Sequence, residues 1–183
     1  MIPVPSVLFT GGCRSGKSGL AQHFIESHAP PFLFLATAQA LDEEMAARIF
    51  RHQADRGPGW RCLEAPLDLP GALENALTRP GHNAILLDCV TVWLGNLVAA
   101  GRNADFILRE AGRIALLLDR PKLPVAVVTN EVGSGIVPAS AMGREFRDLA
   151  GGVNQLLARA CSHVVFAVCG LPLPVKPPGG PLP

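Results

Sequence analysis

The sequence predicts an α/β fold built on one mostly parallel sheet. Short apolar segments alternate along the chain with longer ones whose apolar residues recur every three to four positions, as strands alternate with amphipathic helices. A glycine-rich loop separates the first apolar segment from the first helical one. Hydrophobic residues make up 49% of the 183 residues and charged residues 17%, which favours strands buried on both faces. We expect one domain over residues 1–176.

The first elements are expected to be a strand, a loop, a helix and a second strand. Residues 4–9 are a short apolar run. Residues 17–28 place Leu20 and Phe24 on one helical face, and residues 32–36 are a second apolar run. Because a crossover helix joins strands that run in the same direction, this unit predicts a parallel pair.

The middle of the chain continues the alternation. Residues 41–56 form a predicted helix, with acids in the first turn and arginines toward the end, as the helix dipole favours. Residues 60–66 are extended and stop at a proline, and a helix follows at about residues 67–77. The apolar run AILLDC, residues 84–89, predicts a buried strand that carries an acid near its end.

The C-terminal half is expected to contain two helices, a strand, a long helix and a last strand. The long helix is the best supported, because its apolar residues step by threes and fours over five turns. The final PPGGPLP, residues 177–183, has almost nothing to bury and is expected to be a disordered tail. The five elements are expected at residues 90–100, 104–118, 125–130, 141–160 and 163–168.

The glycine-rich loop TGGCRSGKSG, residues 10–19, has the P-loop spacing of Gly11, four residues, then Gly16-Lys17-Ser18. Its glycines let successive N–H groups point toward phosphate oxygens at a helix N-terminus. Lys17 is expected to reach the β and γ phosphates, and Ser18 to be a ligand of Mg²⁺. A chance turn is disfavoured because a strand precedes the loop and a helix follows it. Arg14 either holds phosphate or faces solvent.

Two further residues allow two interpretations each. Asp88 ends an apolar strand, so it either holds a water on Mg²⁺ or caps the next helix; the ends of strands in open sheets favour a ligand contact. His52 lies four residues from both Arg48 and Arg56. These two positive charges favour a neutral imidazole, and the arginines are also able to bind phosphate oxygens. Asp55 is able to neutralise either arginine. Spacing alone favours an exposed histidine on a charged helix.

Charge, termini and cysteines exclude several classes of protein. The net charge of +1 provides no basic field for nucleic acid. The first residues lack the features of a signal peptide, and the longest apolar stretch contains Asp88, which is costly in a membrane. The five cysteines include no CxxC pair and are expected to be reduced and mostly buried in a cytoplasmic protein. The segment TNEVGSGIVP, residues 129–138, is either a plain connection or a lid.

Several motifs taken together carry a specific resemblance. TGGCRSGKSGLA, RIFRHQADR, LLDCVTVWLGNL, TNEVGSGIVP and GREFRDLAGGVNQLLA follow one another from about residue 7 to residue 176. In this combination the chain resembles the bifunctional adenosylcobinamide kinase / adenosylcobinamide-phosphate guanylyltransferase family of cobalamin biosynthesis. The resemblance implies a RecA-like three-layer fold, usually assembled as a homotrimer.

The resemblance also implies two reactions. A nucleoside triphosphate, ATP or GTP, phosphorylates adenosylcobinamide; GTP then transfers GMP to an enzyme histidine and from there to the corrinoid phosphate, giving adenosylcobinamide-GDP. The family's histidine falls on His52, which replaces the interpretation from spacing alone. The implied GTP contacts are Gly11, Gly12, Cys13, Arg14, Ser15, Gly16, Lys17, Ser18, Thr37, Ala38, Gln39, Gln53, Ala54, Asp55, Arg56, Glu64 and Asp88.

The side-chain chemistry is compatible with these roles. A histidine nucleophile divides one transfer between phosphates into two displacements. Arg48 and Arg56 are suited to stabilise charge on the transferred group. Glu64 and Asp88 are both able to accept hydrogen bonds from the N1–H and amino group of guanine. Asp88 therefore has two competing expectations, a contact to guanine or to magnesium.

Overall fold

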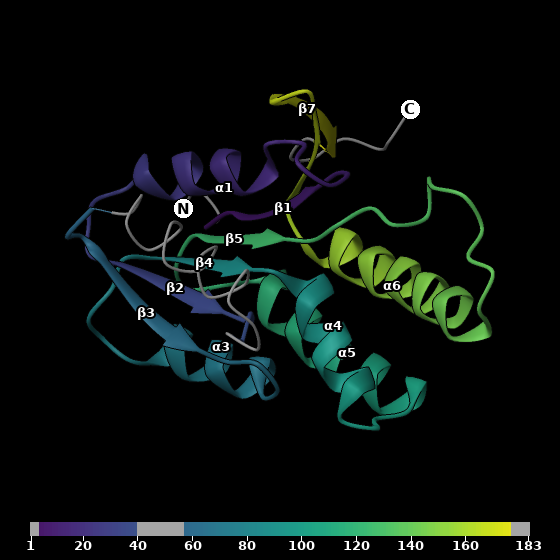
Figure 1. The fold of residues 1–183 in the computed structure, drawn as a ribbon. Helices are drawn as coiled ribbons and strands as arrows, with labels where there is room; N and C mark the ends of the chain where they lie inside the picture. The colour runs from purple at the N-terminus through teal and green to yellow at the C-terminus, as the bar shows by residue number, and fades with distance from the viewer. Residues whose placement is uncertain (1–3, 40–56, 177–183) are drawn as a thin grey trace.

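The computed structural model describes residues 4–39 and 57–176 (Figure 1). Seven strands form one sheet in the order β3-β2-β4-β5-β1-β6-β7. All neighbouring pairs are parallel except β6 and β7, which confirms the predicted mostly parallel sheet. The strands are β1 (Ser6–Thr10), β2 (Phe32–Ala36), β3 (Trp60–Glu64), β4 (Ala84–Asp88), β5 (Val125–Val128), β6 (His163–Val168) and β7 (Leu171–Lys176). The helices are α1 (Lys17–Glu26), α3 (Leu69–Thr78), α4 (Val90–Ala99), α5 (Ala104–Asp119) and α6 (Ala141–Ala160).

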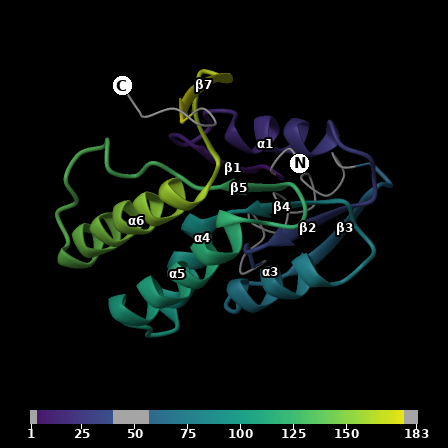
Figure 2. The same cartoon turned by 180° about the vertical axis from the view of Figure 1, so that it is seen from behind.

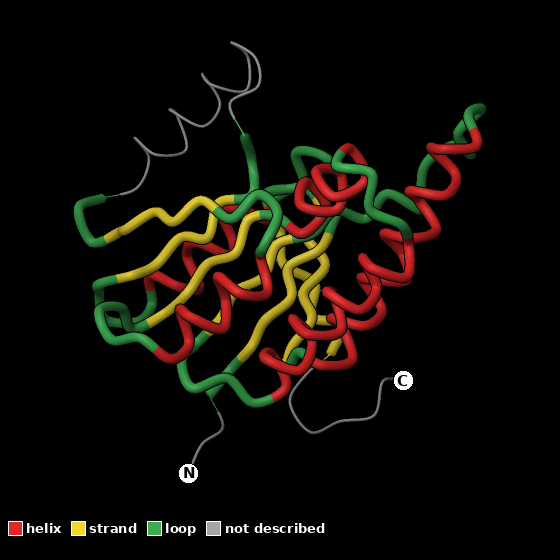
Figure 3. Tube along the Cα trace, turned by 90° about the horizontal axis from the view of Figure 1, so that it is seen from below, coloured by secondary structure: helices red, strands yellow, loops and turns green. Residues whose placement is uncertain are grey.

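The helices cover both faces of the sheet, as Figures 1 and 2 show: α1 lies on one side, and α3, α4, α5 and α6 lie on the other. Figure 3 gives the view from the second side. Alternate residues of each strand enter the two cores. On β5, Val128 packs in the core that contains Ile25 of α1, and Val127 packs in the core that contains Leu157 of α6. Because the strands β1 to β6 run parallel, their carboxyl ends lie along the same side of the sheet.

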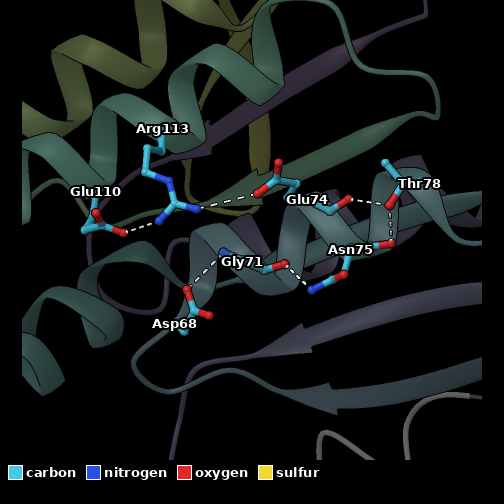
Figure 4. Close-up of polar contacts among 7 residues, drawn as sticks. All are labelled: Asp68, Gly71, Glu74, Asn75, Thr78, Glu110 and Arg113. Carbon is cyan, nitrogen blue, oxygen red and sulfur yellow. Dashed lines mark hydrogen bonds and ion pairs between the residues drawn. The ribbon is translucent and has the colours of Figure 1, made fainter.

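The end of α3 nearest α5 is held by polar contacts (Figure 4). Asp68 is the N-cap of α3, and its Oδ1 accepts a hydrogen bond of 3.0 Å from Gly71 N. Arg113 of α5 donates to Glu110 at 2.8 Å and reaches Glu74 of α3 at 3.5 Å. Because Arg113 and Glu74 are exposed and Glu110 is only half-buried, each ion pair contributes less than about 1 kcal/mol.

Residues 163–168 form strand β6, as expected, but the expectation that this strand is the last one is wrong. β7 follows after the turn at Cys169 and Gly170, whose φ angles of 52° and 80° suit a tight hairpin between antiparallel strands. The sequence LPLPVK did not predict a strand because proline lacks an N–H, but β7 lies at the edge of the sheet, where proline is tolerated. Lys176 Nζ then donates to three carbonyls at the end of α6, at 2.6–3.1 Å.

The remaining described elements agree with the predicted ones within about two residues at each end. The expectation that most cysteines are buried is wrong: Cys89 and Cys161 are buried, whereas Cys13, Cys62 and Cys169 are exposed. The predicted helix at residues 41–56 and the predicted tail at residues 177–183 lie outside the described residues. Within the described ranges, no helix is both long and apolar enough to cross a membrane.

Candidate functional site

The glycine-rich loop joins the end of β1 to the start of α1 and rests against the β6–β7 hairpin. Gly11 has φ +151°, and a Cβ there would lie 2.5 Å from the carbonyl oxygen of Ala167. Gly16, the N-cap of α1, has φ +92°, and its Cβ would lie 2.9 Å from the Cα of Gly170. Gly170 N also donates to the carbonyl of Ser15 at 2.9 Å. Glycine is therefore required at positions 11 and 16, and at each for two reasons, the backbone conformation and the lack of space for a side chain.

Several polar groups of the loop are buried near the N-terminus of α1. Lys17 is buried, and its Nζ donates to the carbonyl of Gly12 at 3.0 Å, so the ammonium lies over the loop. Ser15 Oγ and Thr10 Oγ1 are buried, and neither has a hydrogen-bond partner among the described residues. Ser18 is half-buried in the first turn of α1. Buried polar atoms without partners at a helix N-terminus fit the binding of phosphate.

Three predicted contacts of the loop are more open to solvent. Gly12, Cys13 and Arg14 are all exposed, and Arg14 has φ 55°. In this position a backbone N–H or the guanidinium of Arg14 is accessible to a ligand, and the structure is compatible with either expectation for this side chain.

Asp88 lies on the same face of the sheet as α1, two strands away from the loop. The register aligns Val128 of β5 with Phe9 of β1 on one side and with Asp88 of β4 on the other. Phe9 and Val128 both pack in the core under α1. Asp88 is half-buried at the end of its strand. The N-cap of α4 is Cys89, whose Sγ accepts from Val92 N at 3.4 Å, so Asp88 is not the capping residue.

Burial and the neighbouring negative charge of Asp88 raise the pKa of the Cys89 thiol to about 11. The thiol is therefore neutral at physiological pH and is a poor nucleophile. Its contribution is to packing and to the start of α4.

Thr37 has a structural role that the sequence did not indicate. It is fully buried, its Oγ1 donates to the carbonyl of Cys89 at 2.8 Å, and it accepts from Cys89 N at 2.9 Å. Asn96 of α4 donates to the carbonyls of Thr37 and Pro66 at 2.8 and 3.0 Å. These contacts tie the ends of β2 and β4 to α4 and to the segment after β3. Because the hydroxyl of Thr37 is occupied by Cys89, the residue positions the site through the backbone.

The other predicted contacts at this edge are spread along it. Ala38 is half-buried and Gln39 is exposed, directly after Thr37. Glu64 is exposed at the end of β3, and the register places Ala36 of β2 between Glu64 and Asp88. Two strand spacings, about 10 Å, separate the backbones of Glu64 and Asp88. His52, Gln53, Ala54, Asp55 and Arg56 lie outside the described residues, as does Arg48.

A second polar network, also missed from the sequence, surrounds the end of β5. Thr129 Oγ1 donates to Asn154 Oδ1 of α6 at 2.7 Å and lies 3.2 Å from Thr91 Oγ1 of α4. Thr91 Oγ1 accepts from Asn130 N at 2.7 Å, and Asn154 Nδ2 donates to the carbonyl of Asn130 at 3.0 Å. Glu131 N then donates to the carbonyl of Gly11 at 3.0 Å. The first residues of the segment 129–138 are thus fixed to the glycine-rich loop.

Comparison with known proteins identifies the family. The model of a family described as cobinamide kinase / cobinamide phosphate guanyltransferase matches residues 7–175. The chain belongs to this family. It is 40% identical over 177 residues to the bifunctional adenosylcobalamin biosynthesis protein CobP of Pseudomonas aeruginosa, covering 96% of this chain and 98% of that protein. It is 41% identical over 182 residues to CobU of Salmonella typhimurium, which has the same description, covering 93% and 99%.

Solved structures with a similar fold are more distant in sequence. A protein of Pyrococcus horikoshii superposes with a TM-score of 0.58 at 9% identity, over 97% of this chain and 88% of the other. The RadB recombinase gives a TM-score of 0.53 at 16% identity, over 90% and 74%. At these identities the likeness shows the fold alone. It confirms the predicted P-loop, RecA-like class of this cobinamide kinase / cobinamide phosphate guanyltransferase family member.

Proposed function

We propose that this chain catalyses both reactions named for its family at one nucleotide site: phosphorylation of adenosylcobinamide, then transfer of GMP from GTP to adenosylcobinamide phosphate. The observation that carries the proposal is the loop at residues 11–16. Gly11 and Gly16 have no room for side chains, and Lys17 and the Ser15 hydroxyl, which has no partner among the described residues, are buried at the N-terminus of α1. Such a cradle suits the phosphates of a nucleotide.

The residues at the loop also fit Mg²⁺, which prefers oxygen ligands and retains several waters. Ser18 would supply a hydroxyl and Asp88 a carboxylate, and phosphate oxygens of the nucleotide would provide further ligands. Bound there, Mg²⁺ would offset negative charge on the phosphates. We assign Asp88 to the metal because only β5 separates its strand from β1.

Glu64 is the better of the two carboxylates for guanine. Its strand, β3, is four places from β1 in the sheet, whereas the strand of Asp88 is two places from β1. With strands about 4.8 Å apart, Glu64 lies about 19 Å along the edge from the phosphate loop, toward the far end of an extended nucleotide. Its exposed carboxylate is able to accept from guanine N1–H and the amino group.

In the kinase reaction the hydroxyl oxygen of adenosylcobinamide forms a bond to the γ phosphorus, and the bond to the leaving nucleoside diphosphate breaks. The hydroxyl proton is released. Lys17 and the N–H groups of the loop stabilise the charge that develops on the phosphoryl oxygens. Both ATP and GTP are suitable donors for this chemistry.

In the guanylyl transfer a ring nitrogen of His52 attacks the α phosphorus of GTP, and pyrophosphate leaves. A phosphate oxygen of adenosylcobinamide phosphate then attacks the same phosphorus, and the imidazole leaves, giving adenosylcobinamide-GDP. Arg48 and Arg56 supply positive charge to the transferred group. The residue chemistry and the family membership support this assignment.

We further propose a cytoplasmic homotrimer that acts on corrinoids rather than on nucleic acid. Large exposed apolar side chains near the start of α6, Ile136, Val137 and Met142, support contact between copies of the chain. Ile136 is 96% exposed, which is unusual for such a side chain unless a partner covers it.

The test is the mass of the intact protein after incubation with GTP and Mg²⁺ but without corrinoid. We expect a GMP adduct on the parent and none on His52→Ala. His23→Ala is the matched control, because His23 is an exposed histidine on α1 and has no role in the reaction; it should keep the adduct. An adduct that persists in His52→Ala excludes this nucleophile. A parent that binds GTP without forming an adduct excludes the guanylyltransferase and leaves a kinase.

A further inference from the structure

The segment of residues 129–131 lies between the phosphate loop and Asp88. β5 separates β1 from β4, and its last residue, Val128, is level with Phe9 and with Asp88. Each of these strands is about 5 Å from β5. A phosphate chain that extends from the loop toward Asp88 must therefore cross the end of β5, where residues 129–131 follow.

The backbone of Asn130 is clamped on both sides by side chains. Its N–H donates to Thr91 Oγ1 at 2.7 Å, and its carbonyl accepts from Asn154 Nδ2 at 3.0 Å. The preceding Thr129 is bonded to the same Asn154, and the following Glu131 is bonded to Gly11 of the loop. Such a completely bonded segment has little freedom to change its direction.

The side chain of Asn130 is directed to the phosphate side of the sheet. Val128 packs under α1, and Thr129 faces the other way, toward α4 and α6. β5 ends at Val128, but Thr129 N and Glu131 N still donate to the carbonyls of Phe9 and Gly11, so the extended pairing with β1 continues. The alternation of side chains therefore places Asn130 on the face of α1, which also holds Lys17. The Asn130 side chain is half-buried, and its amide makes no hydrogen bond within the described residues. The backbone is thus fixed while the side-chain donors are left available.

We propose that the Asn130 amide is a further substrate-binding group, which donates a hydrogen bond to the terminal phosphoryl group of the bound triphosphate. Asn154 is then a positioning residue, which acts through the backbone of Asn130. This inference rests on the proposed nucleotide site. A diphosphate lacks the group that Asn130 contacts, so Asn130 distinguishes a triphosphate from a diphosphate.

The experiment compares the affinities of the β,γ-imido analogue of GTP and of GDP, both with Mg²⁺, by calorimetry. A His52→Ala background prevents covalent reaction. Adding Asn130→Ala should weaken binding of the triphosphate analogue by about tenfold to one hundredfold, the range for a hydrogen bond to a charged group, and leave GDP within about twofold. Asn154→Leu should shift the ratio of the two affinities in the same direction, which a general loss of folding would not do.

Asn75→Ala is the matched control, because the Asn75 amide donates to the carbonyl of Gly71 on the distant helix α3. It should leave both affinities unchanged. The inference is overturned if Asn130→Ala keeps the parent ratio, weakens both nucleotides equally, or melts several degrees below Asn75→Ala, since the last result would show a structural side chain. A parent background that binds neither nucleotide overturns the proposed function as well, and is thereby distinguished from a failure of Asn130 alone.

Discussion

Replacing Gly16 by alanine tests how the phosphate loop is held. Gly16 has φ +92°, and an added Cβ would lie 2.9 Å from the Cα of Gly170 in the β6–β7 turn. The obstacle is backbone, so no side-chain rotation relieves it, and the loop or the turn must move. The hydrogen bond of 2.9 Å from Gly170 N to the Ser15 carbonyl would be the first to break.

Two costs add in this variant. Alanine in the left-handed region costs about 1–2 kcal/mol, and forcing atoms into a close-packed site costs about 1–3 kcal/mol. The sum is about 2–5 kcal/mol. In a chain of this length 1 kcal/mol corresponds to roughly 2–4 °C, so the melting temperature should fall by at least about 4 °C.

Thermal unfolding and titration with GTP and Mg²⁺ check the result. Gly19→Ala is the matched control: Gly19 is exposed within α1, and a Cβ there meets no atom of the described residues within 4 Å. That variant should be more stable than the parent by about 0.5–1 kcal/mol. A Gly16→Ala protein that melts with the parent and binds GTP as tightly as Gly19→Ala would refute the reasoning about this close approach.

Three other predictions concern positions outside the loop. Thr37→Val keeps the shape but leaves the Cys89 N–H without a partner, while the Cys89 carbonyl keeps only its hydrogen bond from Trp93 N, so urea unfolding should show a decrease in stability of about 1–3 kcal/mol. Asp68→Ala removes the cap of α3 and should cost about 1 kcal/mol in the same measurement, with nucleotide affinity unchanged. Burial raises the pKa of the Cys89 thiol from 9.0 to about 11 and that of Cys161 to about 12. Above pH 9 the unfolded chain releases these protons before the folded one, so stability is complete below pH 9 and falls by about 1.4 kcal/mol per unit for each thiol up to its folded pKa. Urea midpoints at pH 8 and 10.5 should therefore differ less in Cys161→Ala than in the parent.

The features that could be predicted from the sequence are those that depend on residues close to one another in the chain. The P-loop spacing, the apolar strand that ends at Asp88 and the long helix α6 each follow from a local pattern. The β7 strand was missed because its prolines locally disfavour a strand, and only its edge position makes them acceptable.

The features that were missed depend on residues far apart in the chain. Asn96 and Thr37 are 59 positions apart, and Thr129 and Asn154 are 25 apart. Hydrophobic periodicity does not predict such pairs, because Asn96 and Asn154 lie on helices whose apolar pattern is formed by other residues. The family resemblance implies that Thr37 contacts GTP, and the structure adds a role that the sequence did not indicate: its hydroxyl is bonded to the backbone of Cys89, directly after β4.

The two networks together explain how one carboxylate is held at the centre of the sheet edge. β4, which ends at Asp88, lies between β2 and β5, and a buried threonine follows the end of each neighbour. Thr37 is hydrogen-bonded to Cys89 and Thr129 to Thr91, so the ends of β2 and β5 both hold the start of α4 in place. The backbone next to Asp88 is therefore held from both sides, and little reorganisation would be needed for Asp88 to bind the Mg²⁺ proposed above. The apolar strands place Asp88 at this edge, and the paired threonines give it a fixed position there.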